Sequence, residues 1–338
     1  MTALTPGTEV LLALGGGSAR GMSHIGVIRA LEEAGLVIRG VAGTSIGAVV
    51  GGVYCAGALE AYGEFMSAMD KRGVVRMLDP VLPRGGLFAG KRLTDLMKSF
   101  VGEVMIEDLD VPFSAVAVDV SGGEEVRLTS GRLTRAMRAS FGIPGLFTPY
   151  ALDVAGEQRW LVDGGVASPV PVGAARALGD YPIVAVNVNR VFPEAAIVPS
   201  PKSNGAGRRE RLAAFLDSDR LPDSAREFLR GVFANSKGDD SPGDADGKED
   251  GDSSSASLLQ RLGLFSASAS PSRPGMVDSL YNSVVLLQHH LARSQFEAEP
   301  PALLVEPNME GVGLFDYHLG AALVAEGQRA TREALGSA

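Results

Sequence analysis

Short apolar runs alternate with stretches of helical spacing along most of the chain, and this alternation limits the fold more than any other feature. Residues 9–14 (EVLLAL) form a continuous apolar run that ends in glycines, and residues 22–34 have the spacing of a helix. A second apolar run at 38–42 is followed by a helical pattern from Ile46. Apolar strands joined by helices are typical of a parallel sheet that is covered on both faces. The sequence therefore predicts an α/β fold, a three-layer α/β/α arrangement with a mainly parallel central sheet.

The same alternation predicts the remaining elements. We expect strands at 113–120, 125–129, 160–162, 183–188 and 302–305. We expect helices at 91–101, 133–141, 171–178, 276–296 and 316–335. Together these elements define one domain over residues 9–335.

The alternation is interrupted at residues 199–275, which are rich in Ser, Gly, Asp and Arg. The middle of this insertion, 239–257, holds six Asp, one Glu and one Lys. It buries too little apolar surface to offset its ordering entropy, so we expect the insertion to be partly disordered. Residues 208–233 have the pattern of two short amphipathic helices with six arginines. They form either a solvated insertion or a basic lid whose apolar face contacts an anionic membrane.

The charge and cysteine content exclude several classes of protein. The 338 residues include 31 Lys+Arg and 40 Asp+Glu, a net charge of −9, which argues against a nucleic-acid partner. A single cysteine, Cys55, cannot form an intramolecular disulfide, and four histidines without zinc-site spacing predict no metal. Residues 1–9 lack the pattern of a signal peptide, and the longest small-and-apolar run, 47–59, is too short to cross a bilayer. We therefore expect a cytoplasmic protein.

The most informative motif is G-T-S-I-G, Gly43 to Gly47, between an apolar strand and a helix of small residues. A G-x-S-x-G sequence at a strand-to-helix turn is typical of a nucleophile elbow, in which the glycines permit a strained turn. Ser45 would then lie at a helix N-terminus, where backbone N–H groups favour developing negative charge. The alternative is that Ser45 caps an ordinary turn.

A second motif, L-G-G-G-S-A-R-G, lies between the first strand and the first helix. Its consecutive glycines, Gly15, Gly16 and Gly17, expose backbone N–H groups that can hold a phosphate or an oxyanion. A dinucleotide fingerprint would need a glycine where Arg20 stands, and the Lys-Ser/Thr pair of a phosphate-binding P-loop is missing. A tight turn without further function remains the alternative.

The third motif is D-G-G, Asp163 to Gly165, at the end of the strand R-W-L-V. A carboxylate in this position can be a general base, and it can equally form an Asx turn.

Taken together, the three motifs supply an oxyanion hole, a nucleophile and a base on successive strand ends. In this order they resemble the patatin-like phospholipase family, and more nearly its bacterial branch, which is akin to the catalytic domain of neuropathy target esterase. The resemblance begins with LALGGGSARGMSHIGVIRALEEAGL and G-T-S-I-G. It continues through RASFGIPGLFTPY, WLVDGGVASPVPV and SLYNSVVLLQHHLARSQ to PNMEGVGLFDYHLGAALVAEGQRATREAL. It covers nearly the whole chain except 199–275.

The resemblance implies a serine acyl hydrolase that uses a Ser–Asp dyad without a metal or other cofactor. Ser45 would be the nucleophile and Asp163 its general base. The glycine loop would contain the oxyanion hole, near the N–H groups of Gly16 and Gly17, and Arg20 would steady that loop or meet a lipid phosphate. The other positions that match the family motifs are Gly15, Ser18, Gly43, Gly47, Gly164 and Gly165. The implied substrates are phospholipids, lysophospholipids or acylglycerols, reached by transient contact with a membrane surface.

This chemistry requires Asp163 to be a stronger base than an ordinary Asp. An ordinary Asp, with a pKa of about 3.9, is a weak base near neutral pH. We therefore expect burial to raise the pKa of Asp163 toward the working pH.

Two other readings remain open at this stage. An α/β-hydrolase would use Ser45, an acid and His318, although a nucleophile at residue 45 leaves room for about two preceding strands. A lipid-binding regulatory protein would keep the motifs without turnover. The other histidines, His24, His289 and His290, are expected to be structural.

Overall fold

The computed structural model describes residues 4–81, 85–189, 215, 221–233 and 276–336. Most of the insertion at 199–275, including the acidic stretch expected to be disordered, lies outside these ranges.

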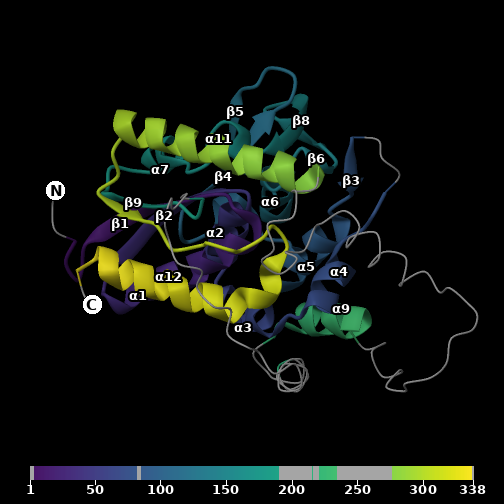
Figure 1. The fold of residues 1–338 in the computed structure, drawn as a ribbon, viewed down its shortest axis with the longest axis horizontal. Helices are drawn as coiled ribbons and strands as arrows, with labels where there is room; N and C mark the ends of the chain where they lie inside the picture. The colour runs from purple at the N-terminus through teal and green to yellow at the C-terminus, as the bar shows by residue number, and fades with distance from the viewer. Residues whose placement is uncertain (1–3, 82–84, 190–214, 216–220, 234–275, 337–338) are drawn as a thin grey trace, which may run out of the picture.

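An eight-stranded mixed sheet runs through the centre of the structure (Figure 1). The strand order is β10-β9-β1-β2-β4-β8-β7, with β5 paired to β4. Five strands are parallel: β1 (Glu9–Leu14), β2 (Val37–Thr44), β4 (Phe113–Asp119), β9 (Ile183–Val186) and β10 (Leu303–Val305). Antiparallel pairing adds β5 (Glu125–Leu128), β7 (Tyr150–Val154) and β8 (Glu157–Asp163). A separate parallel pair contains β3 (Gly86–Phe88) and β6 (Gly145–Phe147).

Helices cover both faces of this sheet. On one face lie α1 (Ser23–Glu33), α2 (Ile46–Cys55), α3 (Leu59–Ala68), α4 (Lys71–Met77), α5 (Lys91–Val101), α6 (Leu133–Ser140) and α12 (Gly320–Ala334). On the other lie α7 (Val172–Arg176) and α11 (Met276–Ala298), above the strands in Figure 1. Short 3₁₀ turns are η1 (Ser18–Met22), η2 (Ile106–Asp108), η3 (Gly164–Val166) and η5 (Asp316–Leu319).

The side chains of β1 show why the fold has three layers. Val10, Leu12 and Leu14 belong to the core under α1 and α2, whereas Leu11 and Ala13 belong to the core under α7 and α11. Successive side chains of a strand point to opposite faces, so a strand that is apolar at every position must be covered on both sides. The predicted three-layer α/β fold with a mainly parallel sheet is confirmed.

Some boundaries differ from the prediction for local reasons. The helical pattern that starts at Ile46 forms two helices, since α2 ends at Cys55 and α3 begins at Leu59. Gly57, with φ of 72°, reverses the chain between them, as glycine after a helix commonly does. The short strands β3, β6 and β7 were not predicted because runs of three to five residues carry little periodic signal.

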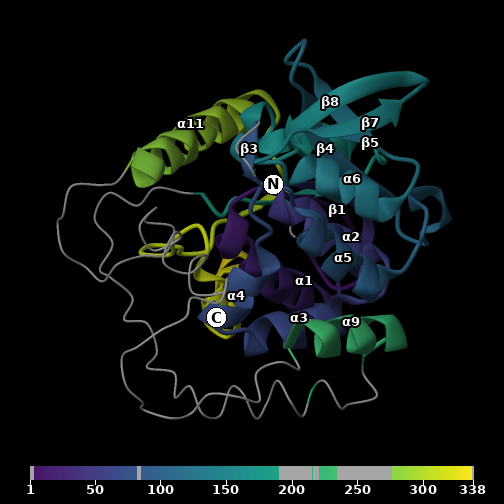
Figure 2. The ribbon, with the colours of Figure 1, turned by 90° about the vertical axis from the view of Figure 1, so that its right-hand side faces the viewer.

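The second amphipathic helix of the insertion is present as α9 (Asp223–Phe233). The first lies outside the described residues except for Phe215. The apolar face of α9 packs on the protein: Ala225 and Leu229 are fully buried, and the Ser224 hydroxyl donates to the Ser99 carbonyl of α5 at 2.8 Å. In Figure 2, α9 lies at the opposite side of the molecule from α11. This face is therefore already covered by protein, which favours the insertion reading over a lid whose apolar side meets a membrane.

No helix within the described residues is both long and apolar enough to cross a bilayer.

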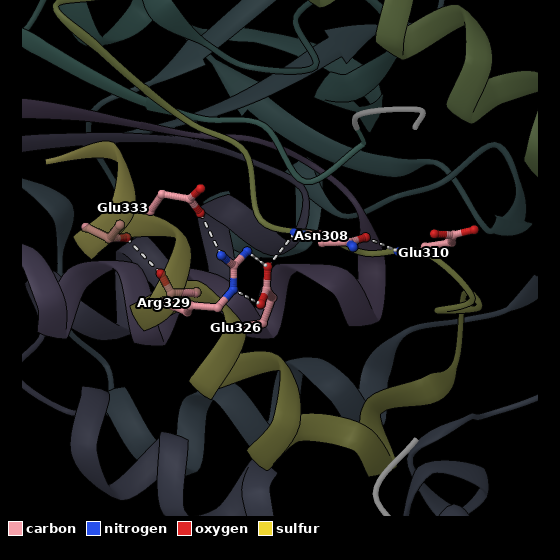
Figure 3. Close-up of polar contacts among 7 residues, drawn as sticks. Asn308, Glu310, Glu326, Arg329 and Glu333 are labelled. Carbon is pink, nitrogen blue, oxygen red and sulfur yellow. Dashed lines mark hydrogen bonds and ion pairs between the residues drawn. The ribbon is translucent and has the colours of Figure 1, made fainter. Parts of the chain in front are cut away.

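The loop that follows β10 is tied to α12 by polar contacts (Figure 3). The Asn308 N–H donates to Glu326 Oε1 at 2.7 Å, and the Glu310 N–H donates to Asn308 Oδ1 at 3.1 Å. Arg329 holds the Glu326 carboxylate with two hydrogen bonds of 2.7 Å and also reaches Glu333. Exposed ion pairs stabilise a fold little, but here they orient the carboxylate that receives the loop. The loop leads on to residues 312–314, which contact the glycine motif.

Helices α1 and α12 cross at a point where neither has room for a side chain. A Cβ on Gly26 would collide with the Val324 carbonyl oxygen, and a Cβ on Gly327 would collide with the Ser23 carbonyl oxygen. These two glycines let the backbones touch, and this crossing fixes α12 against the N-terminal half of the domain.

We expect Gly327→Ala to lower the free energy of unfolding by about 1–3 kcal/mol, because the added methyl group must push the helices apart. The matched control is Gly231→Ala in α9, where a Cβ meets nothing within 4 Å. That change should be neutral or raise stability by up to about 1 kcal/mol through helix propensity. Urea unfolding followed by circular dichroism measures both. Equal stability of Gly327→Ala and wild type would contradict the tight crossing.

Candidate active site

Ser45 occupies a strained turn between β2 and α2. Its φ of 57° and ψ of −124° are rare for a residue other than glycine. The Ser45 N–H donates to Ser140 Oγ at 2.8 Å, and Ser140 Oγ in turn donates to the Val116 carbonyl at 2.6 Å. These two hydrogen bonds anchor the turn to β4, so the position of Ser45 is determined by the sheet.

The flanking glycines are required by close packing. A Cβ on Gly43 would collide with the Ala48 nitrogen, and a Cβ on Gly47 would collide with the Leu14 carbonyl oxygen. Both positions therefore accept only glycine, and tight packing of this kind is also typical of a nucleophile elbow.

Asp163 lies at the end of β8, on the other side of β4 from Ser45. In the sheet register, Thr44 lies opposite Val116 and Asp163 lies opposite Ala117, the next residue of β4. Ser45 follows Thr44 directly. The strand pairing therefore brings two residues that are 118 positions apart in the sequence (163 − 45) to the same level of the sheet.

The carboxylate of Asp163 is buried and only partly satisfied. Oδ1 accepts the Gly165 N–H at 2.8 Å, whereas Oδ2 has no hydrogen bond to any described residue. Next to it, a Cβ on Gly164 would collide with the Val116 carbonyl oxygen, so the turn after Asp163 must begin with glycine. One carboxylate oxygen is thus held by the backbone and the other is left to accept a proton.

Burial raises the pKa of Asp163 from 3.8 to about 6, while the Ser45 hydroxyl and the Gly165 N–H, as donors to the carboxylate, pull the pKa back. The Ser45 hydroxyl acts on the carboxylate but has not closed a full hydrogen bond with Oδ2. Such looseness is common before substrate binds. Asp163 is thus mostly ionised at neutral pH and a stronger base than an ordinary Asp.

The glycine loop passes directly beside Ser45, since a Cβ on Gly16 would lie 3.3 Å from the Ser45 Cβ. Two of its N–H groups are already used: Gly15 donates to the Val186 carbonyl at 3.0 Å and Gly16 to the Pro169 carbonyl at 2.9 Å. The sequence prediction placed the oxyanion hole near the N–H groups of Gly16 and Gly17, and the Gly16 N–H is committed elsewhere. Among described residues, no hydrogen bond engages the N–H groups of Gly17 and Ile46.

Arg20 holds the glycine loop against two other segments. Its Nε donates to the Val312 carbonyl at 3.0 Å and its Nη1 donates to Asn189 Oδ1 at 3.3 Å. Nearby, Ser18 Oγ donates to the Leu314 carbonyl at 2.7 Å. Of the two roles predicted for Arg20, these contacts favour steadying the loop over binding a lipid phosphate.

His24 supports the same loop from inside the protein. Its Nε2 lies 2.7 Å from the Gly15 carbonyl oxygen, and burial lowers the pKa of His24 to about 4. The ring is therefore neutral at pH 7, and Nε2 carries the proton because a carbonyl can only accept. This arrangement matches the structural role expected for His24.

His318 lies outside the cavities beside Ser45. Its Nδ1 is 3.7 Å from Asp316 Oδ1, and it is not among the described residues that line the spaces beside Ser45. His289 and His290 contact each other edge to face on α11 and line neither space. The structure does not bring a histidine to Ser45 within the residues it describes.

Two cavities meet at Ser45. One, of about 80 Å³, is lined mainly by Met, Leu, Val and Phe side chains, including Met66, Met97 and Phe147. The other, of about 370 Å³, is lined by Asp163, Gln288 and the glycine loop together with apolar side chains. Both cavities are mostly apolar, and the larger one contains the Asp163 carboxylate and the Gln288 amide.

Sequence reasoning missed three residues of the site: Ser140, Asn189 and Gln288. Asn189 Nδ2 donates to the Gly16 carbonyl at 3.0 Å and to Gln288 Oε1 at 2.8 Å. Asn189 follows β9 in the run V-N-V-N, and two amides at a strand's carboxyl end are a signal that could have marked it. Ser140 and Gln288 sit within helical patterns that contain no such signal.

The described residues contain no group of three or more His, Cys, Asp or Glu side chains arranged to bind a metal ion.

Comparison with known proteins identifies relatives across nearly the whole chain. A family model described as patatin-like phospholipase matches residues 12–176. An uncharacterised NTE family protein of Mycobacterium bovis is 32% identical over 336 residues, covering 97% of this chain and 91% of that protein. Patatin-like phospholipase domain-containing protein 6 of Mus musculus is 33% identical over 186 residues, covering 54% of this chain and 14% of the mouse protein. Neuropathy target esterase sws of Drosophila melanogaster is 32% identical over 187 residues, covering 54% and 13%. The chain belongs to the NTE family of patatin-like phospholipases.

Proposed function

We propose that this protein is a serine acyl hydrolase that cleaves fatty-acyl esters of phospholipids, lysophospholipids or acylglycerols. The observation that carries the proposal is the pairing of a strained Ser45 with a buried Asp163 of raised pKa at one cavity. Membership of a family of lipid esterases supports the class of substrate.

In the proposed mechanism, Asp163 Oδ2 takes the hydroxyl proton of Ser45 as Ser45 Oγ attacks the ester carbonyl carbon. The N–H groups of Gly17 and Ile46 stabilise the negative charge on the former carbonyl oxygen, an effect of about 3–4 kcal/mol for one such donor. The tetrahedral intermediate collapses to an acyl-serine, and protonated Asp163 returns its proton to the departing alkoxide oxygen. Asp163 then takes a proton from water, whose oxygen attacks the acyl carbonyl. The second tetrahedral intermediate collapses to the fatty acid, and the proton passes from Asp163 to Ser45 Oγ.

In this proposal, each of the two cavities binds a different part of the substrate. The smaller cavity, lined by Met66, Met97 and Phe147, would hold the first methylenes of the acyl chain, since burying each methylene is favourable by about 0.8 kcal/mol. The larger cavity would hold the alcohol part, because the departing oxygen must reach Asp163.

Apolar side chains at the larger cavity support transient contact with a lipid surface. Val166 and Val284 line this cavity and are 52% and 39% exposed, and Leu287 on the same helix as Val284 is 69% exposed. A substrate that must leave a membrane would meet these side chains before Ser45.

Ser45→Ala should lower kcat on a nitrophenyl ester by at least about 10³-fold, because Ser45 Oγ forms the acyl intermediate in the proposed mechanism. A fluorophosphonate probe should label wild type at Ser45, as mass spectrometry of the peptides would show. Ser130→Ala, an exposed serine, is the control and should keep both properties. Turnover near wild type in Ser45→Ala would show that another group is the nucleophile, and no turnover in wild type would support a binding protein.

Asp163→Asn should lower kcat/KM by at least about 10²-fold, since Asn keeps the shape but cannot take the proton. His318→Gln should have only a modest effect, because His318 lies outside the cavities. Circular dichroism checks that both variants fold. The opposite result, an inactive His318→Gln beside an active Asp163→Asn, would replace the dyad with an α/β-hydrolase triad.

The raised pKa of Asp163 predicts an acid limb in the pH profile. The base works only when deprotonated, so kcat/KM should be level above about pH 6 and fall about tenfold per unit below it. The free energy of unfolding should have the opposite pH dependence, because the proton on buried Asp163 stabilises the folded state. This contribution is fully present below pH 3.8 and is lost as the pH rises through about 6. Asp163→Asn should therefore unfold no more easily than wild type at pH 8. A kcat/KM that stays level down to pH 4.5 would show that Asp163 is not the base.

A further inference from the structure

A chain of hydrogen bonds leads from Arg20 through Asn189 to Gln288. Arg20 Nη1 donates to Asn189 Oδ1 at 3.3 Å. The other end of the same amide, Asn189 Nδ2, donates to the Gly16 carbonyl at 3.0 Å and to Gln288 Oε1 at 2.8 Å. Asn189 itself is 2% exposed, so these bonds are made in the interior.

The chemistry of the partners fixes the direction of every bond. A guanidinium can only donate, so the Asn189 oxygen must face Arg20. A backbone carbonyl can only accept, so the Asn189 nitrogen must face Gly16. The second hydrogen of Asn189 Nδ2 needs an acceptor, so the side-chain oxygen of Gln288 must face Asn189. Reversing either amide would set donor against donor, so the orientation of Gln288 follows from the network.

Because Oε1 of Gln288 faces Asn189, its Nε2 faces the other way, toward the D-G-G turn. A Cβ on Gly165 would collide with Gln288 Nε2, so the amide nitrogen lies directly on the backbone beside Asp163. Gln288 lines the larger cavity together with Asp163 and Ser45. No described residue accepts a hydrogen bond from Nε2, although the two N–H bonds of this group are oriented donors.

Helix α11 brings Gln288 to this place from outside the motif-bearing strands. The helix lies over the face of the sheet that carries α7 (Figure 1), and its next glutamine on the same face, Gln295, donates to the Ala167 carbonyl at 3.0 Å. The two glutamines are two helical turns apart and have different partners. Gln295 donates a hydrogen bond to the backbone, whereas Gln288 directs its N–H donor into the larger cavity.

We propose that Gln288 is a substrate-binding residue, whose Nε2–H group donates to an oxygen of the alcohol part of the lipid ester. This proposal rests on the proposed acyl hydrolase function. The alcohol part is the portion concerned because its departing oxygen must reach Asp163, and Gln288 lies on that side of Ser45. Phosphate and glycerol oxygens share the required chemistry, that of a hydrogen-bond acceptor. Asn189 and Arg20 are positioning residues for this donor.

The test compares three esters: lysophosphatidylcholine and monoacylglycerol with the same palmitoyl chain, and nitrophenyl butyrate, which lacks glycerol and phosphate oxygens. Gln288→Leu should lower kcat/KM on a glycerol lipid at least about tenfold more than on nitrophenyl butyrate, mainly through KM. An excess loss confined to lysophosphatidylcholine assigns the acceptor to phosphate, and an equal excess on both lipids assigns it to glycerol. Gln295→Leu is the matched control and should leave the ratio between substrates unchanged.

A second variant separates binding from support of the loop. Gln288→Glu keeps an oxygen for Asn189 and removes the donor, so it should show the same excess loss when measured at about pH 8, where Asp163 is ionised. A loss by the same factor on all three esters, or no loss, would overturn the proposal.

Equilibrium binding of lysophosphatidylcholine below its micelle concentration, in the Ser45→Ala protein, gives a readout without turnover. Adding Gln288→Leu should weaken the Kd at least about tenfold, and an equal Kd would contradict the assignment. If wild type and Ser45→Ala prove equally inactive, the hydrolase function fails, and the comparison of Kd values still decides the role of Gln288.

Discussion

The pairing of β4 with β2 on one side and β8 on the other brings Ser45 and Asp163 together in this protein. Thr44 and Asp163 lie opposite Val116 and Ala117, neighbouring residues of one strand. A shift of one residue in either pairing would turn Asp163 or the elbow toward the opposite face. β2 is buried over its last five residues, and β8 is buried over its last three, Leu161 to Asp163. The buried ends of both strands therefore fix the register that brings Ser45 and Asp163 together.

The strained backbone of Ser45 is also held in place by β4. A non-glycine residue in this region of backbone space carries about 1–3 kcal/mol of unfavourable energy. Hydrogen bonds through Ser140 to Val116, and glycines that allow close contact, hold the turn in place. The ionised carboxylate of Asp163 is also destabilised, because burial removes its charge from water. Ser45 and Asp163 are thus two locally unfavourable features side by side, and the surrounding sheet maintains both.

Much of this could be predicted from the sequence because it depends on local patterns. Apolar runs and helical spacing identify the strands and helices, and the G-x-S-x-G and D-G-G motifs identify Ser45 and Asp163 at their ends. The use of the Gly16 N–H by Pro169 could not be predicted, because it depends on how two loops far apart in the sequence meet. Gln288 was missed for the same reason: its orientation is set by Asn189 and Arg20, and its own helix gives no sign of it.

The anchoring of the glycine loop by the loop before α12 affects the order in which the site is completed during synthesis. Ser45 and Asp163 are translated before Val312 and Leu314, whose carbonyls accept hydrogen bonds from Arg20 and Ser18. Until residues 312–314 have been made, the glycine loop lacks these two hydrogen bonds. The geometry around Ser45 and Asp163 is therefore complete only after this later segment has folded onto the glycine loop.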